Sequence, residues 1–531
     1  MNKAETGILK FFMVILLIPL WKNAEATFSS NLPLLKITTE NNQQIIRESR
    51  RSAKIEIIYN GPGQRNFYSD YAGHFSGNAE IRIRGNSTAG WPKKPYDFKI
   101  VDEQGENRNA SLLDMPEHED WLLLASYLDH SFIRTPLAKH LSMMQGRWAS
   151  KSRMVEVFLN GEYQGIYILI EKIKRSNRRL GVERLERHQI TYPDITGGYI
   201  YEISGQKNNL GETRELNYPD FDKAAPEQIA YIRQYDDNFR NAMRSSDYTD
   251  HYQEWIDADS FVDELIVQEA MRNSDAYGWS AYFHKRREGK INAGPVWDFD
   301  QSAGNSSYPD NGVATGWLYA HHLTNNTPFF WKLLMDDPVF KYKVRTRWES
   351  LREDVYSTEN LMHFIDSIAD LLSEPQSREF QKWPVLGVNF WRETHGYQSR
   401  NTYRKEVDYL KSFLKQRWLW MDQELARVSH PDSVNSSPSG NLDASAIVFP
   451  NPAIDNVSFT ITSEYNTEAV INIYLSYGSQ LIHTSRVTLN KGENNITLPL
   501  ERSIIPGIYI YSIKLENPEN RKLQGKFIKV D

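Results

Sequence analysis

Three aspartates lie in a stretch from residue 273 to residue 305, NSDAYGWSAYFHKRREGKINAGPVWDFDQSAGN. Asp275 is near its start, and Asp298 and Asp300 form an Asp-Phe-Asp sequence near its end. Mg²⁺ prefers oxygen ligands such as carboxylates, and phosphoryl transfer depends on divalent cations that neutralise charge. Residues i and i+2 of an extended segment point to the same side, so Asp298 and Asp300 could face one cation. Asp275, after an expected helix, could orient a substrate hydroxyl. A turn or a cap is the more ordinary explanation of such acids on spacing alone.

The composition excludes several kinds of site. The chain of 531 residues contains no cysteine, so disulfides, thiolate metal sites and a cysteine nucleophile are ruled out. Its net charge of −6 gives no general attraction for nucleic acid or an anionic membrane, and neither partner is expected. The histidines, His321 and His322 included, lack a metal-ligand spacing, so a metal-dependent hydrolase has little support.

The first 26 residues have the features of an export signal. Two lysines precede an apolar run from Phe11 to Trp21, and Ala24 and Ala26 supply the small residues that a signal peptidase requires. The run is short for a membrane span, and no other segment approaches its length. We expect export with cleavage near Ala26 and no transmembrane segment afterwards; an uncleaved anchor is the alternative.

The rest of the chain predicts an α+β protein followed by an all-β domain. AKIEIIYN, AEIRIRGN and KPYDFKIV alternate as strands do, and Asn160-Gly161 joins two further strands in a hairpin, so the first half predicts a largely antiparallel sheet. After about residue 225 the apolar spacing becomes helical, as in PEQIAYIRQYDDNFRNAM and DADSFVDELIVQEAMRN. Further helices are expected in FFWKLLMDDPVFKYKVRTRWESLRED, STENLMHFIDSIADLLSE and TYRKEVDYLKSFLKQRWLWMDQELARV. Residues 429–446 are typical of a flexible linker, and 447–531 predict a small β-sandwich.

Several segments in order resemble the CotH kinase family, the atypical protein kinases named after spore coat protein H. They are IRIRGNSTAGWPKKPYDFKI, DWLLLASYLDHSFIRTPLAKHLS, VEVFLNGEYQGIYILIEKIK, GGYIYEIS and PVWDFDQSAGN. The resemblance covers about residues 50–428. It implies a two-lobed fold similar to that of protein kinases, which binds ATP with Mg²⁺ or Mn²⁺ and transfers phosphate to Ser or Thr of exported or surface proteins.

The resemblance also implies roles for single residues. Asp275 is similar to the catalytic-loop aspartate that accepts or orients the substrate hydroxyl, and Asp298 to the metal-binding aspartate, with Asp300 as an outer or second ligand. Lys99 is our choice for the lysine that faces the nucleotide phosphates, ahead of Lys94 and Arg84. The remaining expectations are that Glu171 pairs with that lysine or with the metal, that Asn305 and Arg134 belong to the family motifs, and that Trp297 and Phe299 pack to fix the loop.

One position departs from the family pattern. Relatives commonly have Asn about five residues after the catalytic aspartate, where it holds a second metal. Here that position is Ser280, and a hydroxyl is a weaker metal ligand than an amide oxygen. Two hypotheses therefore stand: an active exported kinase, or a catalytically weak or inactive protein of kinase-like fold that acts at the surface by binding.

The last domain resembles the type A sorting domain of the type IX secretion system of Bacteroidetes. VFPNPAIDNVSF, INIYLSYGSQLI, GENNITLPL, PGIYIYSIKL and KFIKV carry the resemblance. It implies that the type IX machinery recognises the domain and delivers the protein to the outer-membrane surface or the medium. A generic carbohydrate-binding or fibronectin-like sandwich is the alternative.

Overall fold

The computed structural model describes most of the chain and divides into two compact units, Met1–Pro431 and Asp432–Asp531. The described residues are 28–204, 209–211, 213–308, 310, 312–320, 328–431, 446–449, 453–463, 465–475, 481–500, 507–516 and 522–529. The expected export signal, His321 and His322, and nearly all of the expected linker lie outside the described residues. Each unit is considered by itself below.

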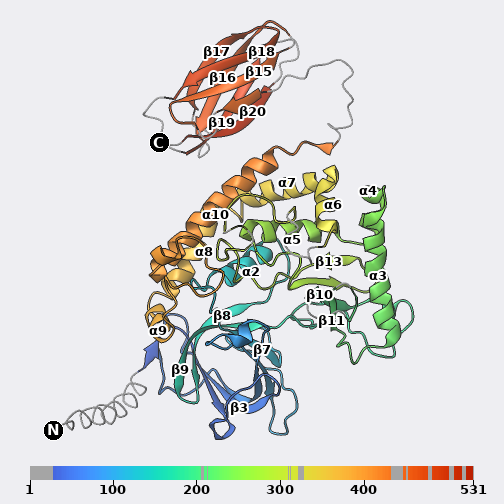
Figure 1. Ribbon diagram of the computed structural model, residues 1–531, viewed down its shortest axis with the longest axis vertical. Helices are drawn as coiled ribbons and strands as arrows, with labels where there is room; N and C mark the ends of the chain where they lie inside the picture. The colour runs from blue at the N-terminus through green and yellow to red at the C-terminus, as the bar shows by residue number, and fades with distance from the viewer. Residues whose placement is uncertain are drawn as a thin grey trace, which may run out of the picture. The chain divides into compact units, whose positions relative to one another are not determined.

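Seven strands of the first unit close into a barrel in the order β2-β3-β5-β6-β7-β9-β8 (Figure 1). Six of the seven pairings are antiparallel, and the parallel pairing of β2 with β8 closes the barrel. Asn160 and Gly161 both have positive φ (50° and 84°) and form the tight turn between β8 and β9, as the sequence predicts. The strands are β2 (Leu34–Thr39), β3 (Arg51–Ile58), β5 (Phe75–Ile83), β6 (Tyr96–Val101), β7 (Asp120–Leu124), β8 (Ser152–Leu159) and β9 (Glu162–Glu171).

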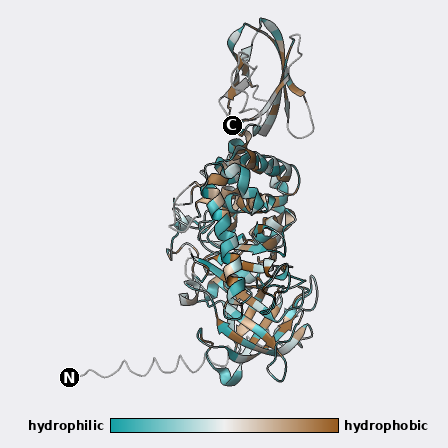
Figure 2. Cartoon of the chain, turned by 90° about the vertical axis from the view of Figure 1, so that its right-hand side faces the viewer, coloured by the Kyte–Doolittle hydropathy of each residue, from teal (hydrophilic) through white to brown (hydrophobic). Residues whose placement is uncertain are grey.

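The barrel strands differ in what covers their outer face. In β6, Phe98 and Ile100 point into the barrel core, whereas Asp97 and Lys99 alternate with them and point outward. In β9 both faces are apolar, because its outer residues pack in one core with helix α2 (Arg134–Met144). Figure 2 shows hydrophobic and hydrophilic residues mixed along the barrel strands. The barrel is thus covered by a helix on one side and presents polar side chains on another.

Beside a two-stranded sheet of β1 (Ser29–Ser30) and β4 (Asn66–Phe67), the first unit contains a second antiparallel sheet and a group of helices (Figure 1). The sheet has the order β11-β10-β12-β13, with β10 (Tyr199–Ile203), β11 (Arg214–Tyr218), β12 (Ala281–Lys285) and β13 (Ile291–Ala293). The helices are α3 (Pro226–Arg244), α4 (Tyr248–His251), α5 (Ala258–Met271), α6 (Phe330–Asp336), α7 (Pro338–Glu353), α8 (Thr358–Leu371), α9 (Pro375–Lys382) and α10 (Tyr403–Ala426). Helix α5 lies among them and contacts α2, α7, α10 and β13. The unit is therefore of mixed α and β structure, as expected.

Two helical features differ from the sequence expectation. The helix predicted over FFWKLLMDDPVFKYKVRTRWESLRED is two helices, α6 and α7, because Pro338 cannot continue a helix and instead occupies its first turn. Asp337 caps α7 by accepting a hydrogen bond from the backbone N–H of Val339 at 2.9 Å. Helices α2 and α9 were not predicted, since each is short and lies between strands or loops.

The second unit consists of two antiparallel sheets. One has the order β14-β15-β18 and the other β17-β16-β19-β20. Alternate residues of β15, among them Val457, Phe459 and Ile461, form one core with residues of the other sheet such as Ile471 and Ile513. The strands are β14 (Ala446–Phe449), β15 (Asn456–Ser463), β16 (Thr467–Leu475), β17 (Leu481–Leu489), β18 (Gly492–Pro499), β19 (Gly507–Leu515) and β20 (Lys522–Lys529). In the described part of the chain, no helix has the length and hydrophobicity to cross a membrane.

Candidate functional site

Two loops of the first unit bring the three aspartates together. Asp275 follows α5, which ends where Arg272 takes a left-handed conformation (φ 45°), and Asp298 and Asp300 follow β13. The side chain of Asn273 connects the loops. Its amide nitrogen donates to the carbonyl of Asp298 at 3.3 Å, and its oxygen accepts from the backbone N–H of Asp275 at 3.3 Å. Asn273 was not identified from the sequence, where it is one more polar residue in a turn.

The loop that carries Asp298 and Asp300 is not an extended strand. Asp298 has φ 61°, so the alternation of an extended segment does not explain how the two carboxylates are aimed. Trp297 and Phe299 are buried and anchor the loop in the core, as expected. Asp298 is exposed between them, whereas Asp300 is partly buried.

Burial and neighbouring negative charge raise the pKa of two of these carboxyl groups, those of Asp275 and Asp300. Burial raises the pKa of Asp275 to about 6, and the charge of Asp298 adds to this, while Arg392 opposes it. Burial also raises the pKa of Asp300 well above its usual value, with further contributions from Asp298, Asp275 and Asp129. None of the three aspartates has an ion-pair partner within 4.0 Å among the described residues. A divalent cation would supply the missing positive charge.

Ser280 lies next to the metal-binding aspartate that the family pattern predicts. Its hydroxyl donates to Oδ2 of Asp298 at 3.3 Å, and its backbone is left-handed (φ 51°). Relatives commonly have a metal-binding amide at this position. Here the Ser280 hydroxyl instead donates a hydrogen bond to the carboxylate of Asp298.

Arg134 and Asn305 brace the segment that follows Asp300. The buried guanidinium of Arg134 donates to the carbonyl of Ser302 at 2.9 Å and to Asp129 Oδ1 at 2.7 Å. The side-chain amide of Asn305 donates to the carbonyl of Asp300 at 2.7 Å. Arg134 and Asn305 bind backbone carbonyls of the loop. They therefore fix the loop and leave the carboxylates of the three aspartates available.

Lys139 of α2 is a buried cation that sequence reasoning missed. Its ammonium donates to the carbonyl of Val296 at 3.2 Å and lies 4.3 Å from the ring centroid of Trp297. Burial lowers the pKa of Lys139 to about 7, although the charges of Asp298, Glu171 and Glu264 oppose the shift. The apolar spacing of α2 gives no signal for it, because only the folded structure places the lysine under the aspartate loop.

Lys99 belongs to a group of outward-facing cations on the barrel, here called the basic face. The basic face consists of Arg50, Arg82, Lys99, Lys172 and Lys174. Asp97 contacts Arg50 Nη2 at 2.9 Å, Arg82 Nη2 at 3.2 Å and Lys172 Nζ at 3.3 Å. Asp120 lies 4.0 Å from Lys99 Nζ and 3.9 Å from Lys174 Nζ. Five cations thus surround two carboxylates, and the excess positive charge suits an anion.

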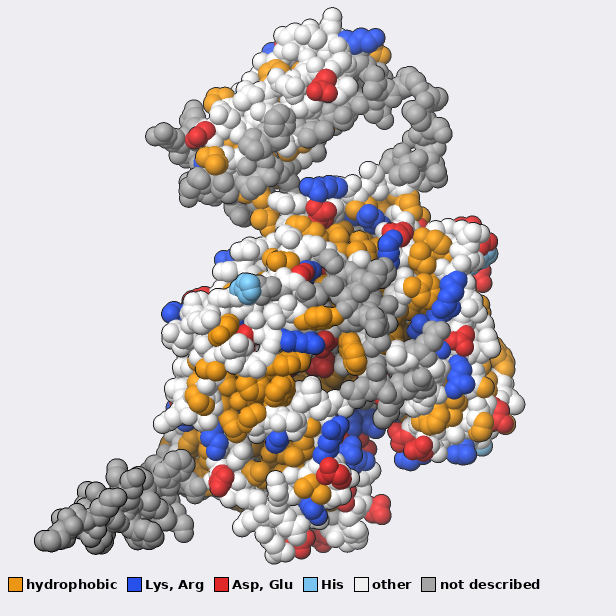
Figure 3. All heavy atoms as spheres, viewed as in Figure 1, with side chains coloured by type: hydrophobic (Ala, Val, Ile, Leu, Met, Phe, Trp, Pro, Cys, Tyr) orange, Lys and Arg blue, Asp and Glu red, His pale blue; other side chains and the backbone are white. Residues whose placement is uncertain are grey.

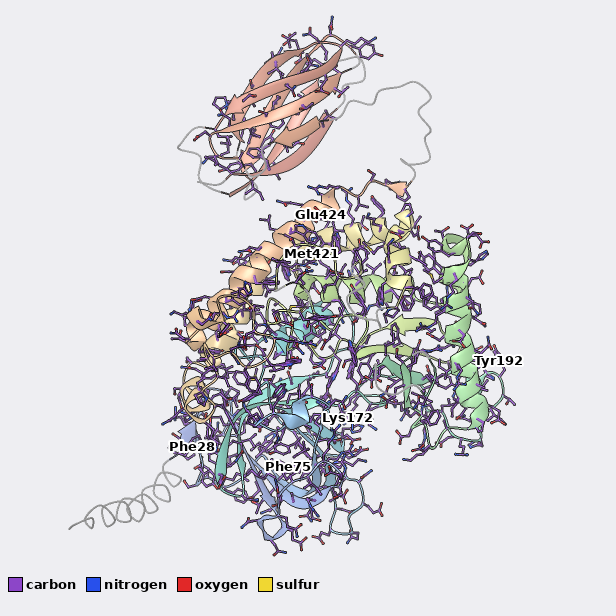
Figure 4. The ribbon with its side chains drawn as sticks, viewed as in Figure 1. Phe28, Phe75, Lys172, Tyr192, Met421 and Glu424 are labelled. Atoms are coloured by element: carbon purple, nitrogen blue, oxygen red, sulfur yellow. The ribbon has the colours of Figure 1, made fainter. Side chains whose placement is uncertain are left out.

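The basic face lies where the barrel approaches the second sheet. Figure 4 labels Lys172 near β7, on the side toward β11, and Figure 3 shows Lys and Arg side chains gathered in that region beside acidic ones. The charge of Asp220, which follows β11, acts on both Lys99 and Lys174 at this boundary.

Lys94 and Glu171, two other residues expected at the nucleotide, have polar partners outside the basic face. Lys94 donates to the carbonyl of Ala89 at 2.9 Å within its own loop. Glu171 lies 3.7 Å from Arg179 Nε and accepts from the backbone N–H of Lys151 at 2.7 Å, so its cation is Arg179 rather than Lys99.

Arg84 lies close to the aspartate loop. Its guanidinium carbon is 6.0 Å from the ring centroid of Trp297, the neighbour of Asp298. Lys93, the neighbour of Lys94, is fully buried, and its ammonium contacts Glu379 Oε1 at 2.7 Å.

A second group of possible metal ligands lies at His118, Glu119 and Asp120, whose ligand atoms are within 4.8 Å of one another. The Nδ1 atom of His118 already accepts the backbone N–H of Asp120 at 3.0 Å. Lys99 and Lys174 approach the same Asp120 carboxylate. Because these cations would repel a divalent ion, the three aspartates are the better candidate for holding one.

Comparison with known proteins gives two family matches. A family model described as CotH kinase protein matches residues 81–421, and one described as a secretion system C-terminal sorting domain matches residues 447–529. No curated protein matches the chain.

Two solved structures resemble small parts of the chain. Dimeric latent PorU from Porphyromonas gingivalis is 24% identical over 16% of this chain and 9% of its own, with a TM-score of 0.15. The CARDB domain of a Pyrococcus furiosus protein, in complex with di-metal ions, is 14% identical over 18% of this chain and 99% of its own, with a TM-score of 0.13. The chain therefore spans less than a tenth of PorU.

Proposed function

The chain belongs to the CotH kinase protein family, and we propose that it is an exported protein kinase that transfers the γ-phosphate of ATP to Ser or Thr side chains of exported or surface proteins. The observation that carries the proposal is the cluster of Asp275, Asp298 and Asp300, which has no ion-pair partner among the described residues and lies in the family-matched region. In this proposal the barrel and the helical part correspond to the two lobes of a kinase-like domain over about residues 50–428.

The delivery of the protein follows from its last domain. Residues 447–529 are a secretion system C-terminal sorting domain, and the protein is exported through the type IX machinery to the cell surface or the extracellular space. We further propose that residues 1–26 are removed as an export signal and that residues 429–446 serve as the linker.

Asp275 is proposed to receive the proton of the acceptor hydroxyl. A pKa of about 6 leaves this carboxylate mostly ionised at pH 7, yet more basic than an ordinary aspartate. The hydroxyl oxygen then forms the new bond to the γ-phosphorus, the bond from that phosphorus to the β–γ bridging oxygen breaks, and ADP departs. The side chain of Asn273 holds Asp275 in a fixed position relative to Asp298 during this step.

Asp298 and Asp300 are proposed to hold Mg²⁺ or Mn²⁺, and their carboxylate oxygens and lack of cationic partners fit a hard cation. When bound, the metal neutralises phosphate charge. Lys99 and its neighbours on the basic face are proposed to bind the nucleotide phosphates, with Arg84 between the basic face and the aspartate loop. Lys94 and Glu171 are proposed to act indirectly, by bracing the strands that carry these cations.

A second function remains open because of Ser280. Its hydroxyl donates to Asp298, where a second metal ligand is expected in relatives. The alternative is a surface protein that keeps the nucleotide and metal site for binding and transfers phosphate weakly or not at all.

The experiment that tests the proposal is the transfer of labelled phosphate from ATP by the purified full chain, with Mg²⁺ or Mn²⁺ and a generic Ser/Thr acceptor. Asp275→Asn and Asp298→Asn should abolish labelling. Asp250→Asn is the matched control, because Asp250 is exposed on α4 and has no ion-pair partner in the described part of the chain. Labelling that survives Asp275→Asn would contradict the assigned base. Metal-dependent ATP binding without any labelling would instead favour the alternative function.

A further inference from the structure

Arg392 is held in a fixed position beside the aspartate cluster. It lies in the loop between α9 and α10, and its backbone is left-handed (φ 52°). The carbonyl of Arg392 accepts the backbone N–H of Ser307 at 2.7 Å. The guanidinium carbon lies 4.4 Å from the ring centroid of Trp391 and 4.8 Å from that of Tyr308. Two aromatic rings therefore orient the guanidinium, which lowers the entropy lost when it binds a partner.

This oriented guanidinium has no acidic partner among the residues that the structure describes. Among the described residues, none offers Arg392 a carboxylate within 4.0 Å or a side-chain or backbone acceptor for its N–H groups. Other arginines of this region are paired: Arg134 contacts Asp129 at 2.7 Å, and Arg400 contacts Glu393 at 3.2 Å. Arg392 is also exposed, so its five donors are free to meet an anionic ligand.

An anionic ligand bound to Arg392 would lie near the acceptor hydroxyl. Its charge acts on the carboxylate of Asp275 and lowers the pKa of that group against the effect of burial. An anion held by Arg392 would therefore lie close to the atom that receives the hydroxyl proton. The basic face lies on the barrel instead, where Lys99 and Lys172, which approach Asp120 and Asp97, are proposed to bind the nucleotide phosphates.

Aromatic side chains extend from Arg392 as a partly exposed ledge. The ledge consists of Trp91, Tyr127, Phe390 and Trp391. The ring centroids of Trp91 and Phe390 are 4.8 Å apart, those of Trp91 and Trp391 are 5.7 Å apart, and those of Tyr127 and Phe390 are 4.9 Å apart. A polypeptide lying along the ledge would bury apolar surface on these rings and bring a side chain to Arg392. The phosphate groups of a nucleotide have no apolar surface to bury on these rings.

We propose that Arg392 and this aromatic ledge form a binding site for the acceptor polypeptide, in which Arg392 pairs with a Glu or Asp carboxylate close to the phosphorylated Ser or Thr. The inference rests on the proposed kinase function and adds its acceptor class, an acidic peptide. The positions next to the acceptor Ser or Thr in sequence are therefore where the acidic residue is expected.

The test compares two Ser-containing peptides that differ only in having Glu or Gln at the positions flanking the serine. We expect kcat/KM of the full chain to be about tenfold higher for the Glu peptide, the size of one charge-assisted contact. Arg392→Gln should remove this preference by raising KM for the Glu peptide, with KM for ATP unchanged. Arg427→Gln is the matched control, because Arg427 is an exposed arginine just beyond the far end of the 24-residue helix α10.

Binding without turnover separates this inference from the kinase proposal. Fluorescence anisotropy of the labelled Glu and Gln peptides is measured on the full chain without nucleotide. Weaker binding of the Glu peptide to Arg392→Gln, even if no phosphate is transferred, would support the acidic site while the kinase proposal fails. Phosphate transfer with no preference for Glu would overturn the acidic site and leave the kinase standing. A rise in KM for ATP in Arg392→Gln would overturn it too, because the guanidinium would then contact the nucleotide.

Discussion

Replacement of Asp275 by Asn should stabilise the metal-free protein at neutral pH, although the same change should abolish phosphate transfer. Asp275 is an ionised carboxylate held in a largely buried position near the charge of Asp298. Asparagine has nearly the same shape and carries no charge, so it removes the desolvation of the ion and the repulsion from Asp298. The site would then be a place where function costs stability.

The size of the effect follows from the pKa of Asp275, which rises from 3.8 to about 6. At 1.36 kcal/mol per pKa unit, this shift corresponds to about 3 kcal/mol. The carboxylate keeps some contact with solvent, so we expect a gain of about 1–3 kcal/mol in the free energy of unfolding. Because the folded pKa exceeds the unfolded one, the penalty is full above pH 6, fades between pH 6 and 4, and is absent below. The gain of Asp275→Asn should follow the same course.

Tryptophan fluorescence in urea is the suitable assay, because all 14 tryptophans precede residue 431 and none lies in the sorting domain. Unfolding is measured with EDTA at pH 7.5 and at pH 4, for the wild type, Asp275→Asn and the control Asp250→Asn. The control should change stability by less than about 0.5 kcal/mol at either pH. The reasoning would be refuted if Asp275→Asn were no more stable than the wild type at pH 7.5, or if its gain were the same at pH 4.

Two further outcomes are expected. Lys93 and Glu379 form a buried ion pair at 2.7 Å between the barrel and α9, so Lys93→Met should lower the free energy of unfolding in urea by about 3–5 kcal/mol. Lys93→Met combined with Glu379→Leu should lose less, since no unpaired charge remains; a larger loss in the double variant would contradict this. Deletion of residues 447–531 should leave the protein in the periplasm, as measured by cell fractionation, and surface delivery of the shortened chain would argue against the sorting role.

The sequence predicted those parts of the fold that have a local signal. The alternation of KPYDFKIV and the turn at Asn160-Gly161 correspond to β6 and to the β8–β9 hairpin. The closure of the barrel had no such signal, because it depends on the parallel pairing of β2 with β8, which are far apart in the chain. Parallel register between distant strands follows from the packing of the whole barrel and not from the residues of either strand.

The candidate site divides in a similar way. Asp275, Asp298 and Asp300 could be proposed from the sequence, because they lie in segments that resemble the family and because carboxylates are preferred ligands of Mg²⁺. Asn273 and Lys139 were not, since an asparagine in a turn and a lysine on a short helix are common and become informative only when their hydrogen bonds are known. The surroundings of the lysines in WPKKPYDFKI likewise needed the structure, in which Lys99 points outward from β6 and Lys93, before that strand, is buried against Glu379.

The charges of the first unit themselves argue that the aspartate cluster is functional. Several buried charges of this unit contact an opposite charge directly: Arg417 contacts Glu269 at 2.8 Å, and Lys93 contacts Glu379 at 2.7 Å. Among the described residues, the carboxylates of Asp275 and Asp300 have no such partner, and burial raises the pKa of both groups. A purely structural role would be served better by asparagine or by a paired acid, because an unpaired buried charge destabilises the fold. In the proposed function, a bound divalent cation would supply the positive charge that balances the cluster.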